Sequence, residues 1–308
     1  MKPAAAMTVE AYAKVNLVLE VAAKRVDGYH ALRSLVVPVS LADTLEIRSV
    51  PNRRRGSGAP GTGSVPNRGR GSGAPEPPSF AKDLALRAAA ALRARCGAQA
   101  FADIRTEKRI PVGGGLGGGS ADAAAALVAL NGIWGAGLGP QELCDIGAEV
   151  GSDVPALVLS RFCGAVLMEG RGEKVSPAPF ANVPLNLVLA NPGVFSSTAE
   201  VFAKCVPRVA KRDEILYNMR TALESGELGR IAAALVNDLE KPASALHPEI
   251  AAAKSALAGA GTVGAAMSGS GSTVFGLVPT EARGREIAAS LVAKGLSAWS
   301  VKTVCPVV

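Results

Sequence analysis

The feature that most constrains this chain is a run of six glycines within seven positions, Gly113–Gly119, followed directly by an alanine-rich stretch. Glycine brings no side chain to a core, and within a regular element it costs about 0.5–1 kcal/mol relative to alanine. Such a run is expected where the backbone approaches another group closely. The stretch after the run predicts a helix. A glycine loop that leads into a helix offers free backbone N–H groups and the positive end of the helix dipole, which indicates a polyphosphate site.

Three other kinds of glycine-rich segment fit this run less well. The spacing Gly113-x-Gly115-x-x-Gly118 fits a dinucleotide fingerprint, but the acidic residue that the fingerprint needs about 20 positions later is missing around Leu138. A P-loop ends in Gly-Lys-Ser/Thr, whereas this run ends without a lysine. A flexible linker would mix Gly with Ser between polar flanks, whereas this run lies between Ile110 and alanines.

Composition narrows the class of protein. A length of 308 residues predicts about two domains, and 48% hydrophobic residues are enough for a core. The sequence has no uninterrupted apolar run of about 18 residues, as a membrane span requires, and no apolar segment typical of a signal peptide near residue 1. Five scattered cysteines without a CxxC pair indicate reduced thiols and no metal site. We therefore predict a cytoplasmic protein with no membrane partner.

One segment differs from the rest of the chain. Residues 50–60 return as residues 65–75 in a near-perfect direct repeat, rich in Gly, Pro, Ser and Arg. This composition cannot bury apolar surface, so we predict that the insert 50–79 is disordered or mobile. The insert carries much of the net charge of +7, which raises the alternative of an RNA-binding protein. Because the insert has no aromatic residues for base stacking, we favour no nucleic-acid partner.

Two early segments carry candidate polar residues. Lys14 and Asn16 are two positions apart in the apolar stretch 9–21, so they lie on one face of an expected strand. Tyr29 and His30 follow an Asp-Gly turn. An aromatic residue beside a histidine at a turn is a candidate binding site.

Two later segments add an acid and a second loop. Asp153, within Gly-Ser-Asp-Val-Pro, stands at an expected helix-to-strand junction, where it is either a displayed acid or an ordinary Asx turn or helix cap. The small-residue segment 264–275 contains Ser-Gly-Ser-Gly at 268–271, between an expected helix and an expected strand. Its hydroxyl and N–H groups can face phosphate oxygens.

In this order and spacing, the motifs resemble one family along essentially the whole chain outside the insert. Pro111 to Ala121 is similar to the P-x-x-x-G-L-G-x-x-S-A loop of the GHMP small-molecule kinases. The Lys-x-Asn strand and the Asp-Gly-Tyr-His turn narrow the resemblance to the 4-diphosphocytidyl-2-C-methyl-D-erythritol kinases of that superfamily, which act in non-mevalonate isoprenoid synthesis. Sibling kinases with mevalonate, homoserine or a sugar as acceptor are the nearest alternative.

The resemblance implies an α+β, two-domain GHMP kinase fold. Residues 1–160 would form an N-terminal α/β domain with a left-handed βαβ unit, and residues 161–308 a C-terminal ferredoxin-like domain. ATP and the alcohol would meet between the domains, and the γ-phosphoryl group would pass to the tertiary 2-hydroxyl of the methylerythritol part. The chain would act as a monomer or homodimer on a small-molecule substrate.

The resemblance also implies roles for the acceptor side. Asp153 would accept the hydroxyl proton as general base, and Lys14 would keep that carboxylate ionised and stabilise the attacking oxygen. Tyr29 and Phe202 would sandwich the cytosine, and His30 would hydrogen-bond its edge. The predicted acceptor-binding residues are Asn16, Tyr29, His30, Thr198 and Phe202.

On the ATP side, the first glycine loop would wrap the triphosphate, and Mg²⁺ would be held mainly by phosphate oxygens and water. Lys108 matches an adenine-side position of the family. The family usually has Asp-Asn-Leu before the helix expected at residue 84, with the Asn touching adenine, whereas this chain has Lys-Asp-Leu at 82–84. The predicted ATP-binding residues are Lys108, Pro111, Gly113, Gly114, Gly115, Leu116, Gly117, Gly118, Gly119, Ser120, Ser268, Gly269, Ser270 and Gly271.

Overall fold

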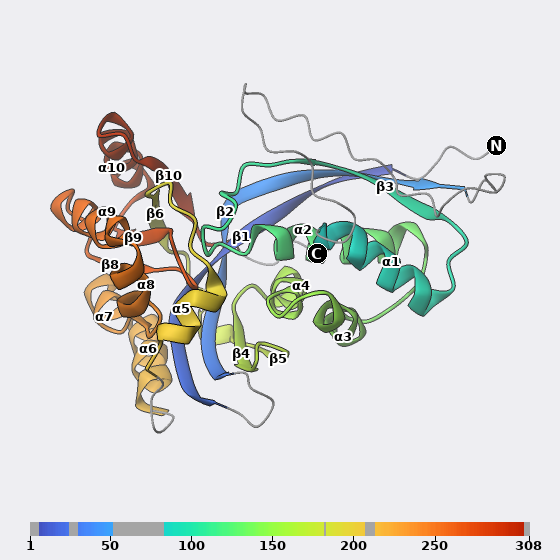
Figure 1. Cartoon of the computed structure of the whole chain (residues 1–308), viewed down its shortest axis with the longest axis horizontal. Coiled ribbons are helices and arrows are strands. Elements are labelled where there is room, and N and C mark those ends of the chain that lie inside the picture. The colour runs from blue at the N-terminus through green and yellow to red at the C-terminus, as the bar shows by residue number, and fades with distance from the viewer. Residues whose placement is uncertain (1–5, 25–29, 52–82, 182, 207–212, 305–308) are drawn as a thin grey trace.

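The structure is a computed structural model that describes residues 6–24, 30–51, 83–181, 183–206 and 213–304. Two sheets and their helices form a two-domain α+β fold, as predicted (Figure 1). Tyr29 and nearly all of the repeat insert, from residue 52 onward, lie outside the described residues. The predicted disorder of the insert therefore stays a prediction.

The first sheet is built around one long antiparallel hairpin. β1 (Ala6–Lys24) pairs with β2 (His30–Val50) along almost its whole length. Residues 13–21 of β1 and 33–39 of β2 are buried without interruption, as strand segments covered on both faces require. The strand order is β5-β4-β2-β1-β7, with β3 also on β2. The short strands are β3 (Phe101–Glu107), β4 (Val166–Gly170), β5 (Lys174–Pro177) and β7 (Val236–Asn237).

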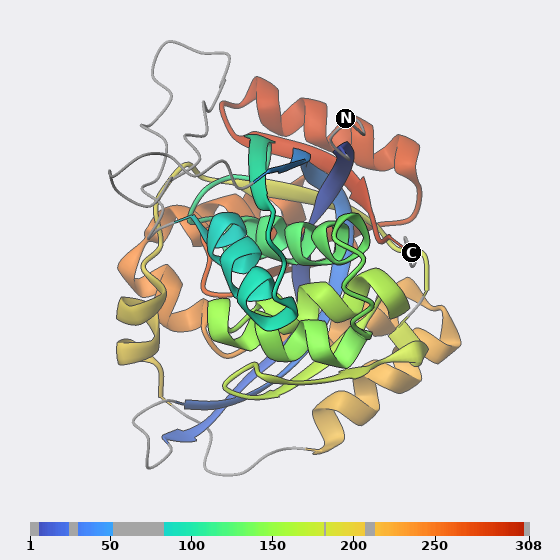
Figure 2. The same cartoon turned by 90° about the vertical axis from the view of Figure 1, so that its right-hand side faces the viewer.

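Four helices cover one face of the long strands, as Figure 2 shows. They are α1 (Leu84–Cys96), α2 (Gly118–Ile133), α3 (Pro140–Val150) and α4 (Val154–Cys163). α2 packs against both β1 and β2. Its buried surface is mostly alanine, and such small side chains let the helix lie close to the strands that carry Lys14.

The second sheet is antiparallel, in the order β10-β6-β9-β8. Its strands are β6 (Asn186–Asn191), β8 (Gly264–Met267), β9 (Val274–Val278) and β10 (Ser297–Lys302). Helices lie between β6 and β8 and between β9 and β10, which gives the strand–helix–strand order of a ferredoxin-like unit. These helices are α5 (Thr198–Lys204), α6 (Asp213–Ser225), α7 (Leu228–Ala233), α8 (Glu240–Leu246), α9 (Pro248–Gly259) and α10 (Glu281–Ala293).

Three strands that follow the predicted boundary at 160/161 belong to the first sheet. β4 and β5 follow that boundary but pair with β2 in the first sheet, and a 3-10 helix, η1 (Pro179–Ala181), comes before the second sheet begins. β7, from the later half, pairs in parallel with β1. The exact division of the chain into domains stays a prediction.

One predicted element is wrong. Asp153 does not stand before a strand, because α4 starts at Val154. Pro155 lies in the first turn of α4, where proline is tolerated since the N–H that it lacks has no intrahelical acceptor there. Asp153 therefore stands between two helices, α3 and α4.

Candidate active site

The two predicted glycine loops lie against one another, although they are far apart in the sequence. Ser268 Oγ donates to the carbonyl oxygen of Gly115 at 3.0 Å, and Thr273 N donates to that of Gly114 at 3.1 Å. Gly115 has φ +74°, and a Cβ built on it would lie 2.2 Å from the Ser268 carbonyl oxygen. Only glycine fits this contact. The two loops therefore pack backbone against backbone, and residues 268–271 of the second loop are buried.

The first loop ends where α2 begins. Gly117 is the N-cap of α2, has φ +69° and provides no side-chain cap. Gly117 therefore has no side chain that could accept hydrogen bonds from the first N–H groups of α2. N–H groups that are left free in this way can bind an anion. Ser120 lies in the first turn of α2. Leu116 is buried below the loop, and its carbonyl oxygen accepts a hydrogen bond from Lys14 N at 3.0 Å.

Lys14 and Asp153 meet beside these loops. Lys14 Nζ lies 3.7 Å from Asp153 Oδ2. The Lys14 side chain is 5% exposed and that of Asp153 is 37% exposed, so the acid is the member of the pair that solvent or a ligand reaches. Asp153 occupies the N-cap position of α4, yet its side chain makes no capping hydrogen bond. The alternative that the Asp153 side chain caps a helix is therefore wrong, since its carboxylate makes no hydrogen bond to the N-terminus of α4.

The second loop also reaches Lys14. A Cβ built on Gly269 would lie 3.0 Å from Lys14 Nζ, and one built on Gly117 would lie 3.2 Å from Lys14 Cγ. Burial lowers the pKa of Lys14, and the attraction of Asp153 opposes this shift. The ammonium group is thus held in a dry site with one nearby carboxylate.

Asn16 organises this centre from inside. Its Oδ1 accepts hydrogen bonds from Lys14 Nζ at 2.7 Å and from Gly269 N at 2.9 Å, and its Nδ2 donates to Ser34 Oγ at 2.7 Å. Asn16 is buried, and these bonds orient the lysine and the second loop together. The contact of Asn16 with the acceptor stays a prediction. To reach Asn16, the acceptor would have to share or replace one of these hydrogen bonds.

The predicted base-binding residues come together from different parts of the chain. The rings of His30, at the start of β2, and Phe202, in α5, are stacked with their centroids 6.0 Å apart and their planes at 27°. Thr198, the first residue of α5, has its Oγ1 2.8 Å from Ser270 Oγ. α5 therefore connects the aromatic pair to the second glycine loop.

Lys108 lies in a second charged cluster, at the start of the first loop. Its Nζ forms ion pairs with Asp43 and, at 2.7 Å, with Asp122 Oδ2 of α2. Asp43 is fully buried, and its Oδ1 accepts from Arg109 N at 2.5 Å and Ile110 N at 2.9 Å. The predicted adenine contact of Lys108 is untested, and its ammonium group is already held by two acids.

One ammonium group serves two carboxylates in this cluster, and their pKa values reflect that. Burial raises the pKa of Asp122 to about 7; Lys108 opposes the shift and Asp43 adds to it. Burial by itself would lower the pKa of Lys108, but the two carboxylates raise it. The sequence analysis did not identify Asp43 or Asp122 as functional. The only local signal was a charged residue interrupting the apolar stretch around 41–44.

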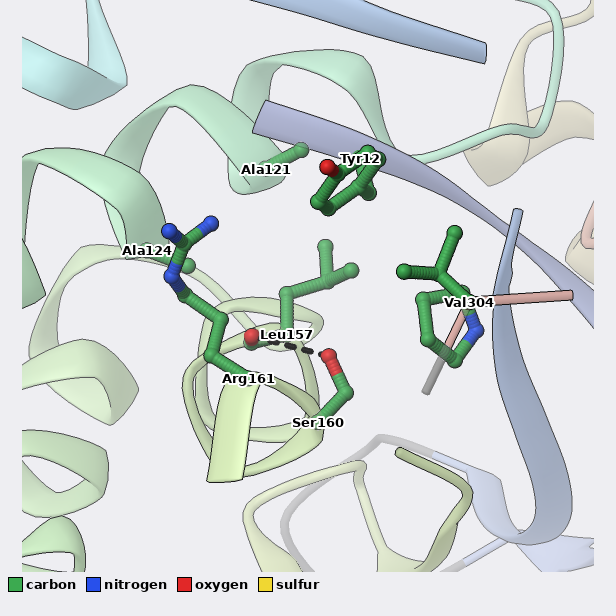
Figure 3. A pocket seen from close by; sticks show the side chains of 8 residues that line it. Tyr12, Ala121, Ala124, Leu157, Ser160, Arg161 and Val304 are labelled. Atoms are coloured by element: carbon green, nitrogen blue, oxygen red, sulfur yellow. Dashed lines mark hydrogen bonds between the residues drawn. The ribbon is translucent and has the colours of Figure 1, made fainter. Parts of the chain in front are cut away.

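Other features of the described residues add no metal cage and no membrane span. They contain no group of three or more His, Cys, Asp or Glu residues that could hold a metal ion. No helix among them has the length and apolar character needed to cross a bilayer. A small cavity between β1, α2 and α4 is lined by Tyr12, Leu157 and Arg161 among others (Figure 3), and it contains none of the predicted site residues.

The geometry suits chemistry on a phosphorylated ligand. The first loop and the N-terminus of α2 can bind phosphate oxygens. Residues 268–271 of the second loop are buried, and the N–H groups of Ser268, Gly269 and Gly271 already donate within the protein, so the predicted phosphate contact of this loop stays a prediction. A buried ammonium group next to them can stabilise negative charge that develops during a reaction. A partly exposed carboxylate within reach of that ammonium can accept a proton.

Comparison with known proteins points in the same direction. Residues 83–161 match the GHMP kinases N terminal domain, and residues 219–297 match the GHMP kinases C terminal family. A 4-diphosphocytidyl-2-C-methyl-D-erythritol kinase of Symbiobacterium thermophilum is 39% identical over 302 residues, covering 96% of this chain and 99% of the relative. A protein of the same name from Pelotomaculum thermopropionicum is 42% identical, covering 92% of this chain and 93% of the relative.

Solved structures show the same fold. A 4-(cytidine 5'-diphospho)-2C-methyl-D-erythritol kinase aligns with a TM-score of 0.76 and 33% identity, covering 96% of this chain and 99% of that one. A homoserine kinase from Cytophaga hutchinsonii aligns with a TM-score of 0.72, covering 97% of this chain and 95% of that one. At 19% identity, the second likeness shows the fold alone.

Proposed function

Because this chain belongs to the 4-diphosphocytidyl-2-C-methyl-D-erythritol kinase family of the GHMP kinases, it is an ATP-dependent small-molecule kinase, and we propose that its phosphoryl transfer takes place at Lys14 and Asp153. The reaction is phosphorylation of the 2-hydroxyl of 4-diphosphocytidyl-2-C-methyl-D-erythritol by ATP, in non-mevalonate isoprenoid synthesis. The observation that carries the proposed site is the 3.7 Å pair of Lys14 Nζ and Asp153 Oδ2 beside both glycine loops.

In this proposal Asp153 accepts the proton of the attacking hydroxyl. A tertiary alcohol is a poor nucleophile, so a positioned base contributes roughly 10²–10⁴-fold. Lys14 stabilises the charge that grows on the attacking oxygen and on the transferred group. It acts from a dry site, where such an interaction is stronger than in water. Asn16 holds the Lys14 ammonium group in place through its 2.7 Å hydrogen bond.

The two glycine loops and the start of α2 would bind the triphosphate. Phosphoryl transfer depends mostly on positioning and on neutralising the phosphate charge, and Mg²⁺ supplies part of that neutralisation when it is bound. The described residues offer no cage of three or more metal-binding side chains. We therefore propose that Mg²⁺ is held mainly by phosphate oxygens and water, which is usual for this ion in kinases.

The acceptor would bind on the side of α5. Phe202 would form one side of the sandwich around the cytosine base, and His30, whose ring stacks against Phe202, would hydrogen-bond the edge of the base. Tyr29, which lies outside the described residues, would complete that site, and Thr198 and Asn16 would contact the rest of the acceptor. We further propose that the protein works in the cytoplasm. The four cysteines among the described residues are free, which fits a reducing compartment. The prediction of a monomer or homodimer stays a prediction.

The experiment that tests the proposal measures ADP release by the purified protein with Mg-ATP and a panel of alcohols. The panel contains cytidine-diphospho-methylerythritol, mevalonate, homoserine and galactose. We expect turnover with the cytidylated alcohol alone. Phe202→Ala should raise the KM for this alcohol and change the KM for ATP little. Turnover with another member of the panel would keep the fold and overturn the assignment of His30 and Phe202.

A further inference from the structure

Asn237, in the two-residue strand β7, lies outside every motif described above, yet its amide group is fully engaged. Nδ2 donates to the carbonyl oxygen of Met267 at 2.7 Å and to that of Gly269 at 2.9 Å. Oδ1 accepts a hydrogen bond from Leu239 N at 2.9 Å. One side chain of β7 therefore holds the start of the second glycine loop.

β7 is in turn fixed to β1, the strand that carries Lys14. Leu19 of β1 pairs with Asn237, and the carbonyl oxygen of Leu19 accepts a hydrogen bond from Asp238 N at 2.9 Å. The amide of Asn237 thus sets the position of Gly269 relative to the same strand from which the lysine projects.

Gly269 is the residue of the second loop that lies against the Lys14 ammonium group. A Cβ built on Gly269 would lie 3.0 Å from Lys14 Nζ and 2.8 Å from the carbonyl oxygen of Gly115. The N–H of Gly269 donates to Asn16 Oδ1 at 2.9 Å, and the same oxygen accepts from Lys14 Nζ at 2.7 Å. A shift of Gly269 would therefore change both the space around the ammonium group and the hydrogen bond that orients it.

The far end of the second loop has attachments of its own. The carbonyl oxygen of Ser270 accepts a hydrogen bond from Ser196 Oγ at 2.7 Å, and Thr273 N donates to the carbonyl oxygen of Gly114 at 3.1 Å. Loss of the Asn237 hydrogen bonds should thus loosen the loop where it meets the ammonium group, and leave its contacts with α5 and with the first loop in place.

We propose that Asn237 is a positioning residue for phosphoryl transfer. It holds Gly269, and Gly269 with Asn16 keeps the ammonium group of Lys14 where charge develops. This inference rests on the proposed function, since it concerns the same site. Among side chains of this size, only that of asparagine offers two donors for two carbonyl oxygens together with an acceptor for an N–H group. A displacement of about 1 Å at a reacting group, caused by a change far from the chemistry, can cost about 100-fold in rate.

Steady-state kinetics of the whole protein with Mg-ATP and the cytidylated alcohol tests this role. Asn237→Leu keeps the size of the side chain but removes both donors. Its kcat is expected to fall about 10–100-fold, while both KM values stay within about twofold. Asn237→Asp keeps the acceptor for Leu239 N but turns a carboxylate towards two carbonyl oxygens, so its kcat should fall at least as far.

Asn131→Leu is the matched control. Asn131 Nδ2 donates to the carbonyl oxygen of Leu138, and Asn131 Oδ1 accepts from Leu138 N, both at 3.0 Å. The amide therefore closes the connection between α2 and α3 much as Asn237 holds the second loop, but it has no link to Lys14. This variant should keep the kcat of the unaltered protein.

A double-mutant cycle separates positioning from mere support of the fold. In Asn16→Ala the link from Gly269 to the ammonium group is already broken, so Asn237→Leu should lower kcat further by less than about threefold. An equally large fall in both backgrounds, an unchanged kcat in both Asn237 variants, or loss of the fold in both of them on thermal unfolding would overturn the proposal. If only Asn237→Leu fails to fold, Asn237→Asp takes its place in the cycle. If the unaltered protein turns over none of the alcohols in the panel, the proposed function fails and this inference with it, and that outcome is visible before any variant is made.

Discussion

Two lysines lie beside the first glycine loop, and their surroundings differ: the Lys14 side chain is buried, whereas that of Lys108 is 27% exposed. Lys14 faces one carboxylate, Asp153, at 3.7 Å, and burial lowers its pKa. Lys108 is held by Asp43 and Asp122, and its pKa is raised. An ammonium group with a single, partly exposed partner is available to a ligand. One between two acids is already neutralised, so its main contribution is to structure.

The partners of the two lysines differ in the same way. Asp153 makes no hydrogen bond to the cap of α4 and is more than a third exposed. Asp43 is fully buried and accepts two backbone N–H groups at the start of the glycine loop. The first acid is displayed towards a substrate, whereas the second fixes the path of the chain into the loop. The comparison therefore predicts that changes at Lys14 and Asp153 affect rate, and changes around Lys108 affect stability and the shape of the loop.

The largest expected effect comes from Asp153→Asn. Loss of the general base should lower kcat by roughly 10²–10⁴-fold, with the KM for ATP nearly unchanged, because the loops that bind phosphate are untouched. The measurement is ADP release with saturating substrates. Asp145→Asn, an exposed acid in α3, is the matched control and should keep full activity. A loss below tenfold for Asp153→Asn would remove it from the role of base.

Asp43→Ala should instead affect folding. It leaves Lys108 with one partner and two backbone N–H groups without their acceptor, and breaking a buried ion pair in this way costs about 3–5 kcal/mol. Urea unfolding measures this loss. Asp43→Asn keeps an acceptor oxygen and should lose clearly less. If Asp43→Ala is as stable as the unaltered protein but has lost its kcat, then the division between the two clusters is wrong.

Lys14→Met should lower kcat by about 10²–10³-fold, as removal of one charge-stabilising donor does. A pH profile separates this role from packing. Because burial lowers the pKa of Lys14, the charged form is lost as pH rises through a value below the ordinary 10.5, so kcat should fall on that alkaline side. Lys14→Arg, if active, should move the fall to higher pH. An unmoved alkaline limb would show that another group titrates.

The sequence predicted the parts of the site that depend on local pattern. The glycine run, the Lys-x-Asn spacing and the second loop can each be recognised from a few neighbouring residues. The resemblance to a known family then indicated that these segments belong to one site. The close contact of Gly115 with Ser268, and the use of Asn16 to orient Lys14, depend on residues far apart in the chain, and no local pattern encodes them.

The parts of the fold and site that the sequence analysis predicted wrongly or missed have physical explanations. A strand was expected after Asp153, but a helix begins there, and the proline at 155 suits its first turn. The chain between α7 and α8 shows the same dependence on tertiary contacts: α7 ends at Ala233, and the nearby residues Val236 and Asn237 form β7 and pair with Val18 and Leu19 of β1. Tertiary pairing overrode local helix propensity there. Asp43 was missed because a single acid in an apolar stretch does not reveal its partners.

The smallest expected effect is a change in how stability depends on pH. The pKa of Asp122 is about 7 in the folded protein, above its ordinary value of 3.8, so the folded state holds this proton more tightly than the unfolded state does. As pH rises from about 4 to about 7, the unfolded state releases the proton first, and this group lowers the free energy of unfolding by at most about 1.4 kcal/mol per pH unit. Asp122→Asn removes that dependence but keeps an oxygen for Lys108. Thermal unfolding at pH 5, 6 and 7 should therefore show a smaller decline for the variant. If the unaltered protein and the variant lose the same stability between pH 5 and pH 7, then Lys108 keeps Asp122 ionised over this range. The attraction of Lys108 would then outweigh the effect of burial on Asp122.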